Sequence, residues 1–238
     1  MISMPRWFLR FLLLFAAFGA DGWAAQPKIV VRAEPPHIVR RTFDPRNPPA
    51  DMPKLTPPEV GTCQYSFACT SETEIRGLRG RPARVTGIQV DARLTITLWT
   101  PAGGPPNILR HEEAHRALCE VYYGTAESTA RELARKEIGQ NLRASVEQKA
   151  SVSAELKVIQ DRLLAAFLEQ TASRCEFAQK RFDAITDHSR TAVPESAAIK
   201  QAIAEERARY ALTAANRSLS PASASTLGLR QPPTRPNR

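Results

Sequence analysis

The 238-residue sequence is poor in the features that mark several classes of protein. Its one conspicuous apolar run, residues 11–18, has eight residues, whereas a membrane-spanning helix needs about 20. Basic residues are scattered and not interleaved with aromatic ones, and no nucleic-acid-binding motif is present, so we expect no nucleic-acid partner. There are only four histidines and no His-rich run, which argues against a zinc carrier. No internal repeat is present.

The first residues resemble a secretion signal. Arg6 and Arg10 provide positive charge around the start of the apolar run 11–18, and the small residues Gly22 and Ala24 follow it. This order is typical of a cleaved signal peptide, and the run is too short for a membrane anchor. We therefore predict a signal peptide over residues 1–24 and an exported protein, periplasmic or secreted. The formal net charge of +9 allows a weak attraction to an anionic envelope surface.

The segment before residue 100 predicts strands separated by irregular chain. Residues 28–33 favour a short strand, and residues 35–58 contain eight prolines, which indicates an extended arm. We expect residues 60–81 to form loop with possible short strands. Residues 84–99 show apolar alternation typical of strands, with Asp91–Ala92 as a possible hairpin turn.

Two long helices are predicted after residue 106. Asn107 is a good N-cap, and apolar residues recur at helical spacing after it. Helical sequence continues, weakened at Gly124, to about residue 142. A second helix is expected over residues 154–185, with the polar segment 143–151 as the turn between the two.

The first of these helices carries the sequence His-Glu-Glu-Ala-His. His111 and His115 are four residues apart, so their imidazoles lie on one helix face and can bind one metal ion. Glu112 projects beside that ion, where it can accept a proton from a water molecule that attacks a peptide carbonyl. The motif predicts Zn2+ as the cofactor and Glu112 as the catalytic base.

These elements give an α+β fold class, in which short strands or a small antiparallel sheet precede a long helical hairpin carrying the zinc motif, as in zincins. The predicted organisation has five parts: 1–24 signal peptide, 25–59 strand plus Pro-rich arm, 60–190 zincin-like domain, 191–215 C-terminal helix, and 216–238 disordered tail.

Four cysteines in an exported chain suggest two disulfides. The simplest pairing is Cys63–Cys69 and Cys119–Cys175, although four cysteines allow three connectivities. If Cys119 faces Cys175 across the hairpin, the midpoint is residue 147, inside the predicted turn. The same symmetry gives two further pairs, His115 with Gln179 and His111 with Asp183.

A catalytic zinc site also needs a third protein ligand and an open position. Residues 116–121 lack the metzincin continuation of the motif, so the ligand must come from further along. Asp183 reaches the site by the hairpin geometry, and His188 can fold back from the helix end; either can be the ligand while the other orients it. Cys119 is a rival, and Glu127 or Glu132 could supply a carboxylate.

The segment Lys180-Arg-Phe-Asp-Ala-Ile-Thr-Asp-His resembles the second motif of a family of predicted secreted bacterial zinc-dependent proteases, in which an aromatic-Asp pair precedes a threonine and a histidine. The resemblance covers about residues 28–190. It implies zinc binding, with Asp183, Thr186 and His188 on the second motif, and leaves the substrate undefined. The chain has Phe182 where the family usually has tyrosine, and Ser189 where glycine is expected.

Two functions follow as expectations. The first is an exported zinc metallopeptidase with a peptide or protein substrate. The alternative is a non-catalytic scaffold or adaptor of the cell envelope, with a structural or vestigial zinc site. A site closed by four protein ligands would favour the scaffold, and an open position would favour the enzyme.

Overall fold

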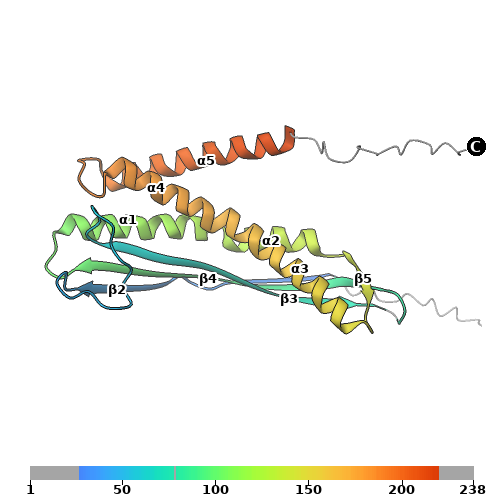
Figure 1. Cartoon of the computed structure of the whole chain (residues 1–238). Coiled ribbons are helices and arrows are strands. Elements are labelled where there is room, and N and C mark those ends of the chain that lie inside the picture. Colours follow the sequence, from blue (N-terminus) through green and yellow to red (C-terminus); the bar gives the residue numbers. More distant parts are fainter. Residues whose placement is uncertain (1–26, 78, 220–238) are drawn as a thin grey trace, which may run out of the picture.

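The computed structural model describes residues 27–77 and 79–219, so the predicted signal peptide and most of the predicted tail lie outside the described residues. Four strands come first along the chain and helices follow, as expected for a mixed α and β fold, with one further strand between the helices (Figure 1). The elements are β1 (Lys28–Ala33), β2 (His37–Phe43), β3 (Thr62–Arg76), β4 (Pro82–Pro101), α1 (Pro106–Tyr123), α2 (Ala126–Glu137), β5 (Asn141–Ser145), α3 (Lys149–Leu168), the π-helical turn η1 (Glu169–Ser173), α4 (Arg174–Thr186) and α5 (Glu195–Leu219).

The five strands form one sheet around the long central strand β4. Strand β3 pairs with β4 in antiparallel orientation along almost its whole length. On the other side of β4, β1 and β2 follow one another and both run parallel to it, while β5 pairs antiparallel near its start. The sheet is therefore mixed, which departs from the expected short strands or small antiparallel sheet because β1 and β2 pair with β4 in parallel.

Strand β4 is uninterrupted, so the hairpin turn expected at Asp91–Ala92 is wrong. Ala92 is completely buried and continues the apolar side of the strand between Val90 and Leu94. Asp91 points to the opposite, open face, where it pairs with Arg32 of β1. Buried and exposed side chains therefore continue to alternate through Asp91 and Ala92, and neither residue interrupts the strand.

Two other segments are more regular than predicted. Residues 60–81, expected to be mostly loop, contain the 15-residue strand β3, whose Phe67 and Cys69 face the core while polar neighbours face outward. The Pro-rich segment contains β2, because no proline interrupts residues 37–43. An edge strand with one exposed face needs few apolar residues, which explains why its composition resembles a loop.

Helices cover one face of the sheet, and α5 packs on the outer side of this helical layer (Figure 1). Helix α1 begins at Pro106, so Asn107 lies inside the helix and is not its N-cap. The predicted hairpin is more complex than expected: α1 ends before Gly124, α2 is separate, and β5 occupies residues predicted as helix and turn. Among the described residues, no helix is both long enough and apolar enough to cross a membrane.

Candidate metal centre

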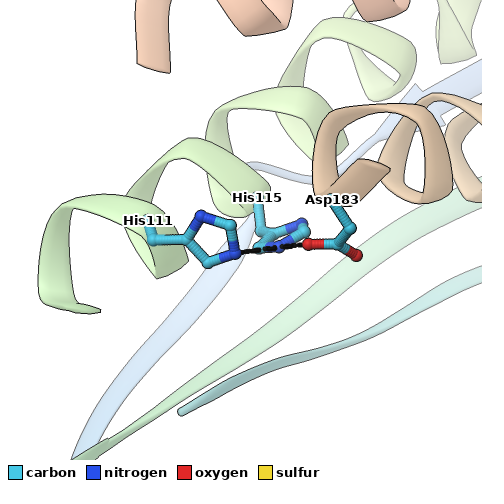
Figure 2. A group of neighbouring side chains, drawn as sticks. All are labelled: His111, His115 and Asp183. Atoms are coloured by element: carbon cyan, nitrogen blue, oxygen red, sulfur yellow. Dashed lines mark hydrogen bonds and ion pairs between the residues drawn. The ribbon is translucent and has the colours of Figure 1, made fainter. Parts of the chain in front are cut away.

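Three of the predicted ligands converge on one point. His111 and His115 project from one face of α1, and Asp183 reaches toward them from α4 (Figure 2). The Oδ1 atom of Asp183 lies 3.2 Å from His111 Nε2 and 2.9 Å from His115 Nε2, and the two Nε2 atoms are 3.1 Å apart. Burial alone would raise the pKa of Asp183, but hydrogen bonds from both imidazoles outweigh it and hold that pKa well below its usual value.

These distances fit a tetrahedral metal ion. Bonds of 2.0–2.1 Å place neighbouring tetrahedral ligands about 3.3–3.4 Å apart, and the three measured separations lie slightly below this range. Two imidazole nitrogens and one carboxylate oxygen are a donor set for zinc and other divalent transition metals. Within the described part of the chain, this is the one group of acidic, histidine or cysteine side chains with such geometry.

Gln179, one helical turn before Asp183, fixes the orientation of His115. Its Nε2 donates to the backbone carbonyl oxygen of His115 at 2.9 Å, so its Oε1 must face the imidazole. That oxygen contacts His115 Nδ1, which must therefore carry the proton. The opposite nitrogen, Nε2, faces Asp183, and it is the nitrogen that could give up its proton and present a lone pair to a metal ion.

Phe182 supports both imidazoles from the side. Its ring stacks on His111 at 4.9 Å between centroids and meets His115 edge-on at the same distance. Phe182 is completely buried, so it forms a fixed wall that limits rotation of the two rings. The π-helical turn η1 directly precedes α4. Cys175, Gln179 and Asp183 follow it at intervals of four residues, so they lie on the face of α4 that is turned toward α1. Turns of this kind occur often at functional sites.

Glu112 lies beside the three candidate ligands without joining their group. Its side chain is buried, and Oε2 has no hydrogen-bond partner among the described residues. Burial raises the pKa of this carboxyl group to about 7. The backbone of Gly61 passes very close, since a Cβ atom at position 61 would lie only 2.9 Å from Glu112 Oε1. A buried carboxylate without a partner is costly and marks a candidate for proton transfer.

His188 is placed at the edge of the centre by an unusual turn. Asp187, His188 and Ser189 all have positive φ, at 45°, 51° and 71°, which is unfavourable for residues with side chains. Ser189, at the position where glycine was expected, is held by a 2.9 Å hydrogen bond from Asn107 Nδ2 to its Oγ. The turn brings His188 Nδ1 to 3.6 Å from Asp183 Oδ1, so His188 contacts the third ligand without joining the group.

The centre opens into a cavity of about 190 Å3 between α1, α4 and the start of β3. Glu112 and His188 both line it, with the three ligand residues. The chain just before and within β3 forms the opposite wall, through Glu59, Val60 and the first residues of the strand. The three converging side chains, Glu112 and the first residues of β3 therefore all line one cavity.

The four cysteines are present as thiols. Cys63 and Cys69 lie six residues apart on the single strand β3, which separates them by roughly 20 Å, so the predicted disulfide between them is wrong. Cys119 and Cys175 are buried neighbours on α1 and α4 with Sγ atoms 3.8 Å apart. Their pairing, as two facing thiols, agrees with the predicted hairpin symmetry, and a bond between them stays a prediction.

The rival ligands lie elsewhere. Glu127 and Glu132 point to solvent on α2, where they pair with Arg131 and Lys136. Cys119 lies one turn beyond His115, where its sulfur accepts a hydrogen bond from Gln179 and takes no part in the metal-binding group.

Two contributors to the site had no recognised role in the sequence. Gln179 was placed opposite His115 by symmetry, and the signal for its role was its spacing of four residues before Asp183. Gly61 had no such signal, because its closeness to Glu112 depends on how β3 docks against α1.

We compared the chain with models of known protein families, with curated proteins and with solved structures, and none of them matched.

Proposed function

We propose that the protein is an exported zinc-dependent peptidase with a zincin-like arrangement of helix and edge strand. The observation that carries this proposal is Glu112, a buried carboxylate with an unpartnered oxygen beside three converging ligand atoms and facing the same cavity. A site that only bound metal would need no such group. The predicted signal peptide supports the proposed location, periplasmic or secreted.

The donor set supports zinc as the metal. Magnesium and calcium prefer sites built from oxygen atoms, whereas two imidazoles and one carboxylate are a known ligand set of catalytic zinc in hydrolases. A bound zinc ion would act as a Lewis acid and lower the pKa of water toward about 7. Asp183 would supply the negative charge among the ligands, and Gln179 would hold His115 in the tautomer that can bind.

Among the protein's own side chains, Glu112 would transfer the protons. Its free carboxylate oxygen would take a proton from the attacking water molecule and return it to the amine that leaves when the peptide bond breaks. His188, whose Nδ1 lies 3.6 Å from Asp183 Oδ1 beside the same cavity, would help to orient Asp183 and could donate a hydrogen bond to the oxygen of a bound carbonyl group.

The edge of the sheet supports a peptide as the substrate. Among the described strands, β3 pairs only with β4, so its outer edge has no strand partner. The first residues of β3 line the metal cavity. An extended peptide can add to such an edge through main-chain hydrogen bonds, which would carry its backbone past Glu112.

The alternative, a scaffold with a structural zinc site, is less well supported. Structural zinc sites are closed by four protein ligands, whereas three side chains converge here and the remaining side faces a cavity. The open position and the free carboxylate both favour catalysis.

Substitution of Glu112 by glutamine tests this function. Glu112→Gln keeps the shape of the side chain but removes its ability to accept a proton, so hydrolysis of a quenched-fluorescent peptide mixture should fall by on the order of 10²–10⁴. Zinc content should stay unchanged. Glu113→Gln is the matched control, because Glu113 points away from the metal and pairs with Arg40 and Arg116.

Glu113→Gln should retain activity within about threefold of the unmodified protein, since an exposed ion pair contributes little. Equal activity in Glu112→Gln and Glu113→Gln would refute the proposed mechanism. Absence of hydrolysis by the zinc-loaded unmodified protein, across a mixture of varied sequences, would refute the peptidase itself and favour the scaffold.

A further inference from the structure

A second and larger cavity lies next to the metal cavity, under the loop that joins β2 to β3. Its volume is about 630 Å3, within the range of ligand pockets. Figure 1 shows this loop at the end of the sheet where α1 begins. The lining is mainly proline and apolar side chains, with Lys54 and Glu59 as the charged exceptions. Prominent among the apolar residues are Phe43, Pro45, Pro49, Met52, Leu55 and Val60.

The loop is held in shape by its own contacts. The N–H of Asn47 donates to Asp44, and the N–H of Met52 donates to Pro49, which closes two turns. Asp51 is paired with Arg41 of β2. Prolines restrict the backbone between these points, so little conformational entropy remains to be lost when a ligand binds.

Two consecutive residues connect this cavity to the metal centre. Glu59 and Val60 line both cavities. Val60 is 46% exposed, which is high for an aliphatic side chain beside a functional site. Gly61 follows directly and lies against Glu112. Val60, at the boundary between the two cavities, is therefore the chain neighbour of the residue that lies against Glu112, the proposed catalytic base.

We propose that the apolar cavity is a specificity subsite that receives a bulky apolar side chain, of the size of leucine, methionine or phenylalanine, close to the bond that is cleaved. This inference rests on the proposed peptidase function. A peptide that runs along β3 with a carbonyl group at Glu112 carries its neighbouring residues past Val60, because adjacent Cα atoms are about 3.8 Å apart. The apolar lining favours an aliphatic or aromatic side chain over a charged one.

Binding is measured separately from cleavage. The probes are fluorescein-labelled decapeptides of alanine, glycine and serine, in which a single leucine or phenylalanine is moved through every position. The zinc-loaded Glu112→Gln protein binds them without hydrolysis, and anisotropy gives each Kd. We expect one position at which the apolar residue tightens binding by about tenfold to a hundredfold over alanine.

Three variants, each made in the Glu112→Gln protein, locate this preference. Val60→Asn and Leu55→Asn each place a polar amide on the cavity wall and should reduce the preference to less than about threefold, while the affinity for the alanine peptide is kept. Val121→Asn is the matched control, because Val121 is 42% exposed on α1 and lines neither cavity. It should retain the full preference.

The outcomes distinguish the two proposals. A position-independent affinity, or a preference that survives in both Val60→Asn and Leu55→Asn, would overturn the subsite. A preference that both cavity variants abolish would establish the subsite, even if the protein with Glu112 intact cleaves none of the peptides. In that case the peptidase proposal would fail and the cavity would remain a binding site for apolar side chains.

Discussion

Gln179 of α4 and His115 of α1 are joined twice, through the carbonyl oxygen and through the imidazole Nδ1 of the histidine. The amide group of Gln179 therefore contacts both the backbone and the imidazole ring of one proposed ligand. It also donates to the sulfur of Cys119 at 3.1 Å. One side chain thus connects the metal centre to the contact between α1 and α4.

Loss of this amide should weaken metal binding. Gln179→Leu keeps most of the volume but leaves His115 Nδ1 without an acceptor, so the imidazole loses its fixed tautomer and orientation. We expect the Kd for zinc to rise about 10- to 100-fold, as measured by competition with a chromophoric chelator. Gln160→Leu is the control, since Gln160 of α3 hydrogen-bonds to the backbone of Ser71 away from the centre. Equal zinc affinity in both variants would contradict the role of Gln179.

Gly61 should be required for the position of Glu112. In Gly61→Ala the new Cβ would lie 2.9 Å from Glu112 Oε1 and 2.8 Å from the carbonyl oxygen of Trp99. Overpacking of this kind costs about 1–3 kcal/mol, so the variant should unfold at lower urea concentration. A displaced Glu112 should lower kcat more than it changes KM, while zinc affinity is preserved.

Gly124→Ala provides the comparison. Gly124 has right-handed helical backbone angles between α1 and α2, so alanine there should leave kcat unchanged and leave stability unchanged or raise it by up to about 1 kcal/mol. If Gly61→Ala shows the same kcat as Gly124→Ala, the close approach of the loop to Glu112 has no catalytic importance.

Oxidation should link α1 to α4 through Cys119 and Cys175. With oxidised glutathione, the two thiols lose two protons and two electrons to form one disulfide, and the glutathione disulfide is reduced to two thiols. Peptide mapping should recover the Cys119–Cys175 link and no Cys63–Cys69 link. The oxidised protein should be more stable toward urea by about 2–4 kcal/mol. If Cys119 and Cys175 both remain alkylatable after this treatment and denaturation, the prediction is wrong.

The ligand set was accessible from the sequence because it depends on helical spacing. His111 and His115 follow from a separation of four residues on one helix. Asp183 follows from the assumption that two helices pack antiparallel with Cys119 opposite Cys175. The facing cysteines and the contact between His111 and Asp183 confirm that assumption, although the chain between the helices folds differently from the expected turn.

The sheet was harder to predict because its edges carry little apolar sequence. Strand β3 is polar on its open face, so it resembled a loop, and the pairing that makes it a strand comes from β4, with paired residues from 8 to 37 positions apart. The alternation of β4 was correctly recognised, but Asp91 suggested a turn because its partner, Arg32, lies on another strand. The apolar cavity depends on how the proline-rich loop folds back over Phe43, which no local pattern encodes.

X-ray absorption spectroscopy at the zinc edge can decide whether His111, His115 and Asp183 hold one zinc ion. Protein loaded with one equivalent of zinc should show nitrogen and oxygen neighbours at about 2.0–2.2 Å and the outer-shell signals of two imidazole rings. Sulfur neighbours at about 2.3 Å would place the ion at the cysteines and would rule out the proposed site.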